Sequence, residues 1–192
     1  MNMKRTKSMY LRQVTVMLGL IILCMVLLGA GFFSLSYRHQ LEEIQTTLDR
    51  NAGFISSYAN AAITKGDSLS GEDFINYIYS AVRLTDTTVL VCNTKGQILC
   101  AAGVNLNEDL LNSSTIADLS VPSWAVNQLL NGKPYSGVTT FGQLLSSKCY
   151  LTSEVLSPLV QDRVSGELIS SGIPTGFLFV AADATSVLDF LE

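Results

Sequence analysis

The sequence has few of the residues on which catalytic sites usually depend. Only one of its 192 residues, His39, is a histidine, so a Ser-His-Asp or Cys-His arrangement would have to use it. We interpret this residue as a polar interfacial side chain. No glycine-rich phosphate loop of the Walker type is present, and acid pairs such as Glu42-Glu43 occur where solvated charge is the default. We therefore expect no catalytic residue and no cofactor in this chain.

The four cysteines do not form a metal-binding pattern. Their spacing fits no zinc motif, and a single histidine is available to complete one, so no metal site is expected. A four-residue turn at 93–96 pairs Cys92 with Gln97 and puts Cys92 and Cys100 about three positions apart, whereas a disulfide needs Cα atoms within about 7 Å. A bridge from Cys149 to either thiol stays open. We expect unpaired, mostly buried thiols.

Charge is scarce because one segment has none. Charged residues make up 15% of the chain and hydrophobic residues 48%, and residues 13–37 contain no charge at all. About 20 helical residues cover the roughly 30 Å hydrocarbon core of a membrane. A cleaved secretory signal is the alternative, but its apolar region would have only about 7–15 residues. We predict an uncleaved transmembrane helix at residues 13–37, with Cys24 inside it.

The distribution of charge predicts an orientation. Residues 1–12 carry four basic and no acidic side chains, whereas the rest of the chain has twice as many acidic as basic residues. Basic residues favour the cytoplasmic side of a membrane. We therefore expect a cytoplasmic tail at residues 1–12, a single-pass protein of the cell membrane in contact with lipid, and an acidic extracytoplasmic region. Its negative charge argues against a nucleic-acid partner.

A helical pattern follows the apolar segment at residues 38–65. Leu41, Leu48 and Ile55 recur every seven residues, which predicts a two-stranded stalk made of one helix from each subunit of a homodimer. The second core position of that stalk would hold Ile44, Asn51 and Tyr58. The alternative is that the stripe packs on its own domain, and for residues 55–63 we give the two interpretations equal weight.

The remainder, residues 66–183, predicts a domain of mixed α+β class. A helix after Ser70, which serves as its N-cap, buries Phe74, Ile78 and Val82, and a second, short helix begins at Pro122. Residues 104–121 and 161–174 are expected to be irregular. Strands are predicted at 87–93, 97–103, 135–142, 148–160 and 175–183. The last strand is almost wholly apolar, as a central strand is. We expect a mainly antiparallel five-stranded sheet with a long N-terminal helix behind it, and an exit helix at 184–192.

Five residues between the predicted hairpin and the last strand suit a small-molecule site. Such a site needs apolar and aromatic walls with a few polar groups. The candidates are Trp124, Tyr135, Lys148, Tyr150 and Arg163. The alternative is that the aromatic residues belong to an ordinary core and that the two basic residues are solvated.

The layout resembles the extracytoplasmic sensor region, PAS-like or single Cache in type, of bacterial membrane-bound sensor histidine kinases. The resemblance is carried by the hairpin "TTVLVCNTKGQILCAAG", by "LLNGKPYSG" before the third strand, and by "GFLFVAADATSVLDFL" at the end. It implies a homodimer that detects an unknown small molecule or envelope stimulus and transmits it by helix movement. In this family a second membrane span, the phosphorylated histidine and the ATP-binding domain follow, so kinase activity is expected only in a C-terminal part beyond Glu192.

Two other functions remain open on the sequence. One is the sensor region of a chemoreceptor or a diguanylate cyclase, which would share this architecture. The other is a complete single-span envelope scaffold protein without a kinase.

Overall fold

The computed structural model describes residues 3–113, 118–162 and 166–185. The chain divides into two compact units, Met1–Glu42 and Glu43–Glu192. Helix α1, Met3–Lys65, begins in the first unit and ends in the second. One continuous helix thus covers the residues predicted as transmembrane helix and stalk.

In the first unit, the large apolar side chains of α1 between Val14 and Leu35 are exposed. Among the described residues, this is the one helix that is long and apolar enough to cross a membrane, judged by length and composition. An exposed apolar surface of this length is typical of a helix whose solvent is lipid.

The second unit is built on a five-stranded sheet in which every pair of neighbouring strands is antiparallel. Its strands are β1 Thr88–Asn93, β2 Ile98–Ala102, β3 Ser136–Thr139, β4 Cys149–Leu156 and β7 Gly176–Asp183. Their order across the sheet is β2-β1-β7-β4-β3. The predicted α+β class is confirmed, and β7 is the central strand, as its apolar sequence predicted.

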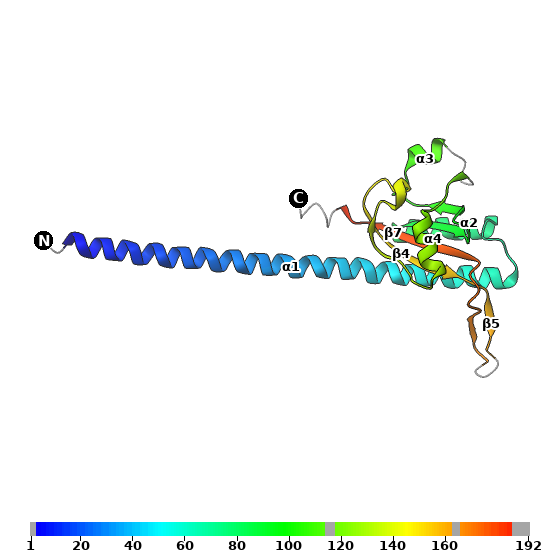
Figure 1. The fold of residues 1–192 in the computed structure, drawn as a ribbon, viewed down its shortest axis with the longest axis horizontal. Helices are drawn as coiled ribbons and strands as arrows, with labels where there is room; N and C mark the ends of the chain where they lie inside the picture. The colour runs from blue at the N-terminus through cyan, green and yellow to red at the C-terminus, as the bar shows by residue number, and fades with distance from the viewer. Residues whose placement is uncertain (1–2, 114–117, 163–165, 186–192) are drawn as a thin grey trace. The chain divides into compact units, whose positions relative to one another are not determined.

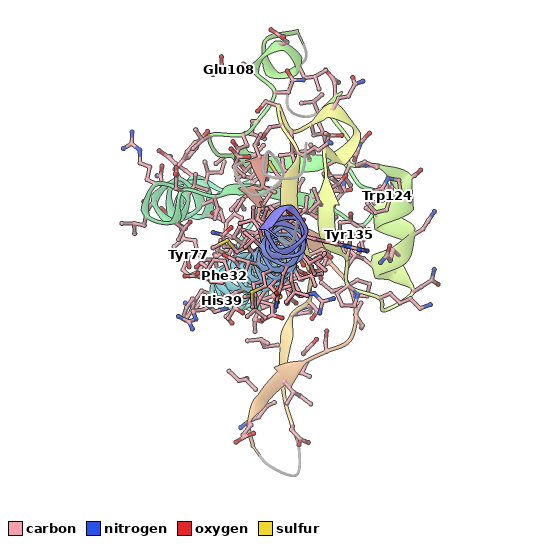
Figure 2. The ribbon with its side chains drawn as sticks, turned by 90° about the vertical axis from the view of Figure 1, so that its left-hand side faces the viewer. Phe32, His39, Tyr77, Glu108, Trp124 and Tyr135 are labelled. Atoms are coloured by element: carbon pink, nitrogen blue, oxygen red, sulfur yellow. The ribbon has the colours of Figure 1, made fainter. Side chains whose placement is uncertain are left out.

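One face of the sheet is covered by the second half of α1 and by α2, Glu72–Thr85. Helix α1 buries Leu48, Ala52, Ile55 and Ala59, at spacings of three and four residues, against Val89, Val91, Leu178 and Val180 of the strands. Helix α2 buries the predicted Phe74, Ile78 and Val82 in the same cluster. In Figure 2, α2 with the labelled Tyr77 and α4 with the labelled Trp124 lie on opposite sides of the strands.

The other face is covered by α4, Ser123–Leu130, and by the segment that follows β3. Ala125, Val126 and Leu129 of α4 pack with Phe177 and Phe179 of the central strand. Because side chains alternate along a strand, β7 contributes Phe177, Phe179 and Ala181 to this face and Leu178 and Val180 to the face under α1. The two cores therefore share one strand.

The hairpin between β1 and β2 has a register that differs from the predicted one. Val91 lies opposite Cys100 and Cys92 opposite Ile98, with a bulge between Val91 and Cys92, whereas the sequence predicted Cys92 opposite Gln97. Cys92 therefore lies on the face of the sheet covered by α4, and Cys100 lies on the face covered by α1 and α2. Their thiols lie on opposite faces of the sheet, which excludes a bridge between them. All four cysteines, Cys149 included, are free.

Three local elements also differ from the prediction. Helix α2 starts after Gly71 with no side-chain cap, since the Ser70 hydroxyl is hydrogen-bonded to that of Ser68, 2.8 Å away. Residues 161–174, expected to be irregular, contribute to a second, two-stranded sheet of β5, Leu159–Gln161, and β6, Leu168–Ser170, which extends from the domain in Figure 1. A short helix, α3, Glu108–Ser113, forms within the stretch expected to be irregular.

The packing of α1 on its own domain contradicts part of the predicted stalk. Leu48 and Ile55 are only 1% and 2% exposed, because the domain's own strands and α2 cover them. These two positions cannot form the core of a two-stranded stalk, so for them the alternative interpretation is correct. Most of the predicted exit helix, residues 186–192, lies outside the described residues.

Candidate functional site

The turn between β1 and β2 forms one wall of a groove. Asn93 fixes this turn, because its Oδ1 accepts hydrogen bonds from the backbone N–H groups of Lys95 (2.9 Å) and Gln97 (3.0 Å). The Gly96 carbonyl in turn accepts a hydrogen bond of 2.9 Å from the Val121 N–H, and the Leu119 carbonyl accepts one of 3.1 Å from Ile98. The hairpin thereby holds residues 119–121, and these lead directly into α4.

The groove lies between this turn and α4 and has a volume of about 650 Å³. Its polar side chains are the Lys95 ammonium, the hydroxyls of Thr94, Ser120 and Ser123, and the Asn127 amide. Its apolar lining comes from Val121, Pro122, Val126 and Leu130. The volume lies within the roughly 300–1,000 Å³ that is usual for small-molecule sites.

The electrostatics of the groove favour an anion. Helix α4 begins after Pro122 without a side-chain cap, so its first N–H groups carry the positive end of the helix dipole. The Lys95 side chain adds a full positive charge, and no acidic residue is among the described residues that line the groove. The arrangement can therefore hold a carboxylate or a similar small anion, with hydroxyl groups available for its polar substituents.

An aromatic cluster supports α4 next to the groove. The Trp124 ring meets the Tyr135 ring edge-on, with centroids 5.0 Å apart, and meets the Phe141 ring at 6.0 Å. Phe141 packs on Phe179 of the central strand at 4.8 Å. Edge-to-face contacts of this kind stabilise by about 0.5–1.5 kcal/mol beyond the area that they bury. A movement of α4 would thus change the packing of Phe141 on the central strand.

The segment after β3 adopts a left-handed backbone beside the groove. Phe141, Gly142 and Gln143 form the 3-10 helix η2, and all three have positive φ angles of 47°, 66° and 71°. Left-handed conformation costs an L-residue roughly 1–2 kcal/mol. Hydrogen bonds to a loop after β2 hold the segment, since Asn107 donates from Nδ2 to the Gln143 carbonyl (3.1 Å) and from its backbone N–H to Leu144 (3.0 Å). Strain of this type is concentrated at functional sites.

The structure brings together two of the five residues that the sequence singled out. Trp124 and Tyr135 are in contact, and Figure 2 labels both. Tyr150 lies on the face of the sheet under α1, where its hydroxyl is 2.9 Å from that of Ser136. Lys148 is exposed just before β4, and Arg163 lies outside the described residues.

Sequence reasoning missed Lys95 and the residues around Pro122 as lining of one groove. The hairpin turn and the start of α4 were each recognised, but nothing in their composition indicated that residues 94–96 contact residues 120–123. The contact depends on backbone hydrogen bonds between distant segments, which leave no pattern in side-chain types.

A polar seam joins α1 to the strand β4 and the residues after it. The Thr152 hydroxyl donates to Asp49 Oδ1 (2.8 Å), the Ser157 N–H donates to Asn60 Oδ1 (2.9 Å), and the Leu159 N–H donates to Thr64 Oγ1 (2.7 Å). These bonds lie along the edge of the buried stripe of α1. They fix the position of the helix along the strand, which apolar contacts alone define less sharply.

The seam contains a pair of carboxyl groups. Burial raises the pKa of Glu154, and the negative charge of Asp49 raises it further. Glu154 follows Thr152 on the same face of β4, so both acids belong to the contact between α1 and the sheet. The pair makes this contact sensitive to pH.

The buried cysteines are poor nucleophiles. Burial raises the pKa of the Cys92 thiol to about 12 and that of Cys100 to about 11, and the pKa of Cys149 is also raised by burial. Because the thiolate is the reactive form, these side chains act as small apolar residues. Among the described residues, no three His, Cys, Asp or Glu side chains gather closely enough to hold a metal ion.

No protein-family model matches the chain, and no curated protein matches it. Among solved structures, the sensor domain of the V. cholerae histidine kinase DctB is 13% identical, with a TM-score of 0.39 over 80% of this chain and 60% of that one. The ligand-binding domain of the Campylobacter jejuni chemoreceptor Tlp3, in complex with 4-methylisoleucine, is also 13% identical, with a TM-score of 0.37 over 80% and 62%. The chain spans about three fifths of the length of both structures. They come from two classes of receptor, so they do not distinguish a kinase from a chemoreceptor.

The left-handed turn predicts a gain in stability from glycine at position 143. Glycine avoids the steric cost at φ 71°, which outweighs its own entropic cost of about 0.5–1 kcal/mol, so Gln143→Gly should raise the free energy of unfolding by up to about 1 kcal/mol. The neighbouring Thr140 has a φ of −90°, so Thr140→Gly should lower the stability instead. Denaturant unfolding of both variants measures the difference. A loss in both would show that the backbone at residue 143 is not strained.

The acid pair predicts a pH-dependent effect of Glu154→Gln. A carboxyl group whose pKa is raised by folding stabilises the domain below its ordinary pKa of about 4.3, and this stabilisation is lost as the pH rises through the folded value. At pH 7 the variant should therefore melt higher than the native chain, by at most about 3 °C because Glu154 is partly exposed. Below about pH 4 the difference should disappear.

Glu43→Gln, at an exposed position of α1, is the control and should show no such profile. Thermal unfolding across pH 3–8 measures all three proteins. A constant difference between Glu154→Gln and the native chain at every pH would contradict the prediction.

Proposed function

We propose that this chain is the signal-sensing portion of a membrane-anchored receptor and that the groove beside α4 binds a small molecule carrying a carboxylate. The first twelve residues would lie in the cytoplasm, and the sheet domain would lie outside the membrane. The uncapped start of α4 and the Lys95 ammonium would hold the negative charge, and the hydroxyls around them would select the rest of the ligand. The candidate residues Trp124 and Tyr135 would support α4 rather than line the groove.

The observation that carries this proposal is the continuity of α1. The same helix, Met3–Lys65, contains the apolar segment and the stripe buried against the sheet. A shift in the packing of the sheet changes the surface on which this stripe rests, and a helix transmits such a shift along its axis. Transitions of about 1–2 Å in packed helices are a common form of signalling.

The sheet offers a physical route from the groove to the helix. Trp124 contacts Phe141, and Phe141 contacts Phe179 on the face under α4. Leu178 and Val180, the neighbours of Phe179 on the same strand, belong to the cluster under α1. A ligand that favours one position of α4 would bias the packing on both faces, provided that it binds one arrangement better than the other.

We further propose that the receptor is a two-component sensor histidine kinase. The support is the sequence resemblance in the hairpin, in the segment before β3 and in β7, together with an α+β architecture that agrees with a PAS-like or single-Cache domain. A chemoreceptor or diguanylate cyclase would use the same sensing portion, and a single-span envelope scaffold would share the anchor and the sheet.

The coding sequence downstream of codon 192 tests the kinase. An apolar span, a helix with a phosphorylatable histidine and an ATP-binding domain are expected there. A methyl-accepting or nucleotide-cyclising domain would instead assign the sensing portion to another receptor class. A stop codon directly after Glu192 would overturn the receptor proposal and favour the scaffold.

Binding at the groove can be followed with Trp124, because it is the only tryptophan in the chain. It lies on α4 and is 44% exposed, so a ligand that shifts the helix should change its emission. We expect saturable changes when the full chain in nanodiscs is titrated with a panel of small carboxylates, amino acids included. Lys95→Ala should weaken the response about tenfold or more, since a charged hydrogen bond contributes about 1.5–3 kcal/mol.

Lys133→Ala is the matched control. Lys133 is exposed and is not among the groove-lining residues, so its replacement should leave the affinity unchanged. If none of the carboxylates changes the emission, or if both lysine variants respond alike, the groove is not the sensing site.

A further inference from the structure

A second groove lies between α1 and α2 and has no charged lining. Its volume is about 230 Å³, and none of the described residues that line it is an Asp, Glu, Lys or Arg. Next to it, Tyr58 of α1 stacks on Tyr77 of α2, labelled in Figure 2, with ring centroids 3.8 Å apart. The groove therefore suits an uncharged and largely apolar occupant. Its lining includes Asn51, Phe54 and Ile55 of α1 and Tyr77, Ala81 and Leu84 of α2.

One polar group of this lining lacks a partner. Asn51 Nδ2 is buried and has no hydrogen-bond partner among the described residues. Buried amide groups are nearly always hydrogen-bonded, and an unpaired one is costly. Because Asn51 lines the groove, a half-turn about its χ2 directs the amide nitrogen toward the opening without any movement of the helix. A hydrogen-bond acceptor in the groove then satisfies it.

Two hydroxyl groups of the groove do not compete for such an acceptor. Ser80 and Thr85 also line the groove, but their hydroxyls donate to the carbonyls of Asn76 (2.8 Å) and Ala81 (2.9 Å), one turn earlier in α2. A hydroxyl has a single proton to donate, so both donors are used within the helix. Of these three polar side chains, Asn51 is the one that retains a free donor for a ligand.

We propose that this groove binds a neutral, apolar small molecule with one hydrogen-bond acceptor, namely a carbonyl compound of the ketone or lactone class. Its carbonyl oxygen accepts a hydrogen bond from the Asn51 amide. Its carbon skeleton covers part of Phe54 and Leu84, which are 66% and 87% exposed. An apolar cavity of about 150 Å³ holds benzene, so 230 Å³ accommodates about nine non-hydrogen atoms.

Such a ligand contacts the buried stripe of α1 as well as α2. Ile55 lines the groove and is only 2% exposed, because it also packs in the cluster under the sheet. An occupant therefore favours the position of the two helices that encloses it best. This site differs from the groove beside α4, where Lys95 and the helix dipole favour an anion. The proposal does not depend on what that first groove binds.

Two probes of the same shape test the site. Acetophenone is a neutral ketone of the expected size, and α-methylstyrene carries CH₂ in place of its oxygen. The full chain in nanodiscs, labelled with 3-fluorotyrosine, reports binding through the ¹⁹F resonance of Tyr77, which Tyr77→Phe assigns. We expect acetophenone to shift this resonance saturably and, at equal free concentrations in water, to bind about five times more tightly than α-methylstyrene, as one net hydrogen bond predicts.

Asn51→Leu separates the amide from the shape of the groove. Leucine has a similar volume and no donor, so this variant should bind the two probes with affinities equal within about twofold. It should also melt no lower than the native chain, since an unpaired buried amide is removed. Asn76→Leu is the matched control. Asn76 is exposed on α2 and is not among the groove-lining residues, so its replacement should leave the preference for the ketone unchanged.

The absence of a saturable shift at Tyr77 up to the solubility limit of acetophenone would overturn the proposal. A groove that a second copy or another protein covers gives this result. A similar shift at every tyrosine would also count against it, because the probe then acts through the lipid. Equal affinities of the native chain for the two probes, or a preference that survives Asn51→Leu, would contradict recognition by the Asn51 amide.

Discussion

The packing of α1 against the sheet is the interaction on which the second unit depends. Leu48, Ala52, Ile55 and Ala59 form a stripe in which large and small residues alternate, and all four are buried in the cluster that α1 shares with the strands and α2. Burying side chains of this kind stabilises by roughly 25 cal/mol for each Å² removed from water. Val89, Val91, Leu178 and Val180 of the sheet belong to the same buried cluster, which α2 completes. The helix is therefore a structural layer of the domain as well as its connection to the apolar segment.

Because α1 packs on the sheet, different faces of the helix make different contacts. The stripe faces the strands, and Asp49, Asn60 and Thr64 at its edge bind β4 and the residues after it. Asn60 and Thr64 accept hydrogen bonds from the backbone N–H groups of Ser157 and Leu159. These bonds therefore do not depend on the side chains at positions 157 and 159. The contact of Asp49 is a hydrogen bond from the Thr152 hydroxyl, and the negative charge of Asp49 also raises the pKa of Glu154. One end of the seam thus depends on backbone N–H groups and the other on side chains alone.

Much of this architecture can be predicted from the sequence, because the residues that an element buries recur at a regular spacing along the chain. Runs of β-branched and apolar residues between turns predicted all five strands of the sheet, and the uninterrupted apolar run of β7 marked it as the central strand. In α2 the spacing of Phe74, Ile78 and Val82 identified the buried face. The length of the uncharged segment from residue 13 to 37 indicated a helix that suits a membrane. These signals are local, since each depends on residues within one element.

The errors arose where the structure depends on backbone geometry or on distant contacts. The register of the β1–β2 hairpin depends on a bulge and on the hydrogen bonds of the Asn93 side chain, neither of which changes the apolar pattern. The strand predicted at 148–160 included Leu159 and Val160 of β5 but did not separate them from β4, and β6 was missed because its residues are exposed and follow no buried period. Tyr150 was grouped with Tyr135 because both are aromatic and near in sequence. Residues of one strand share a face when their numbers differ by an even amount. Tyr135 precedes β3 and Tyr150 lies on β4, so this rule could not be applied to them.

The heptad spacing of α1 illustrates how one pattern can serve two surfaces. A stripe at residues 48 and 55 and another at residues 44, 51 and 58 both satisfy a seven-residue repeat. A helix that packs only on its own domain, or only on a partner, needs just one of these stripes. The sheet takes the first stripe, as the burial of Leu48 and Ile55 shows. The second stripe lies around the helix from the first and retains an asparagine with an unpaired amide beside an exposed phenylalanine. The seven-residue repeat alone therefore does not identify which of the two stripes the sheet covers.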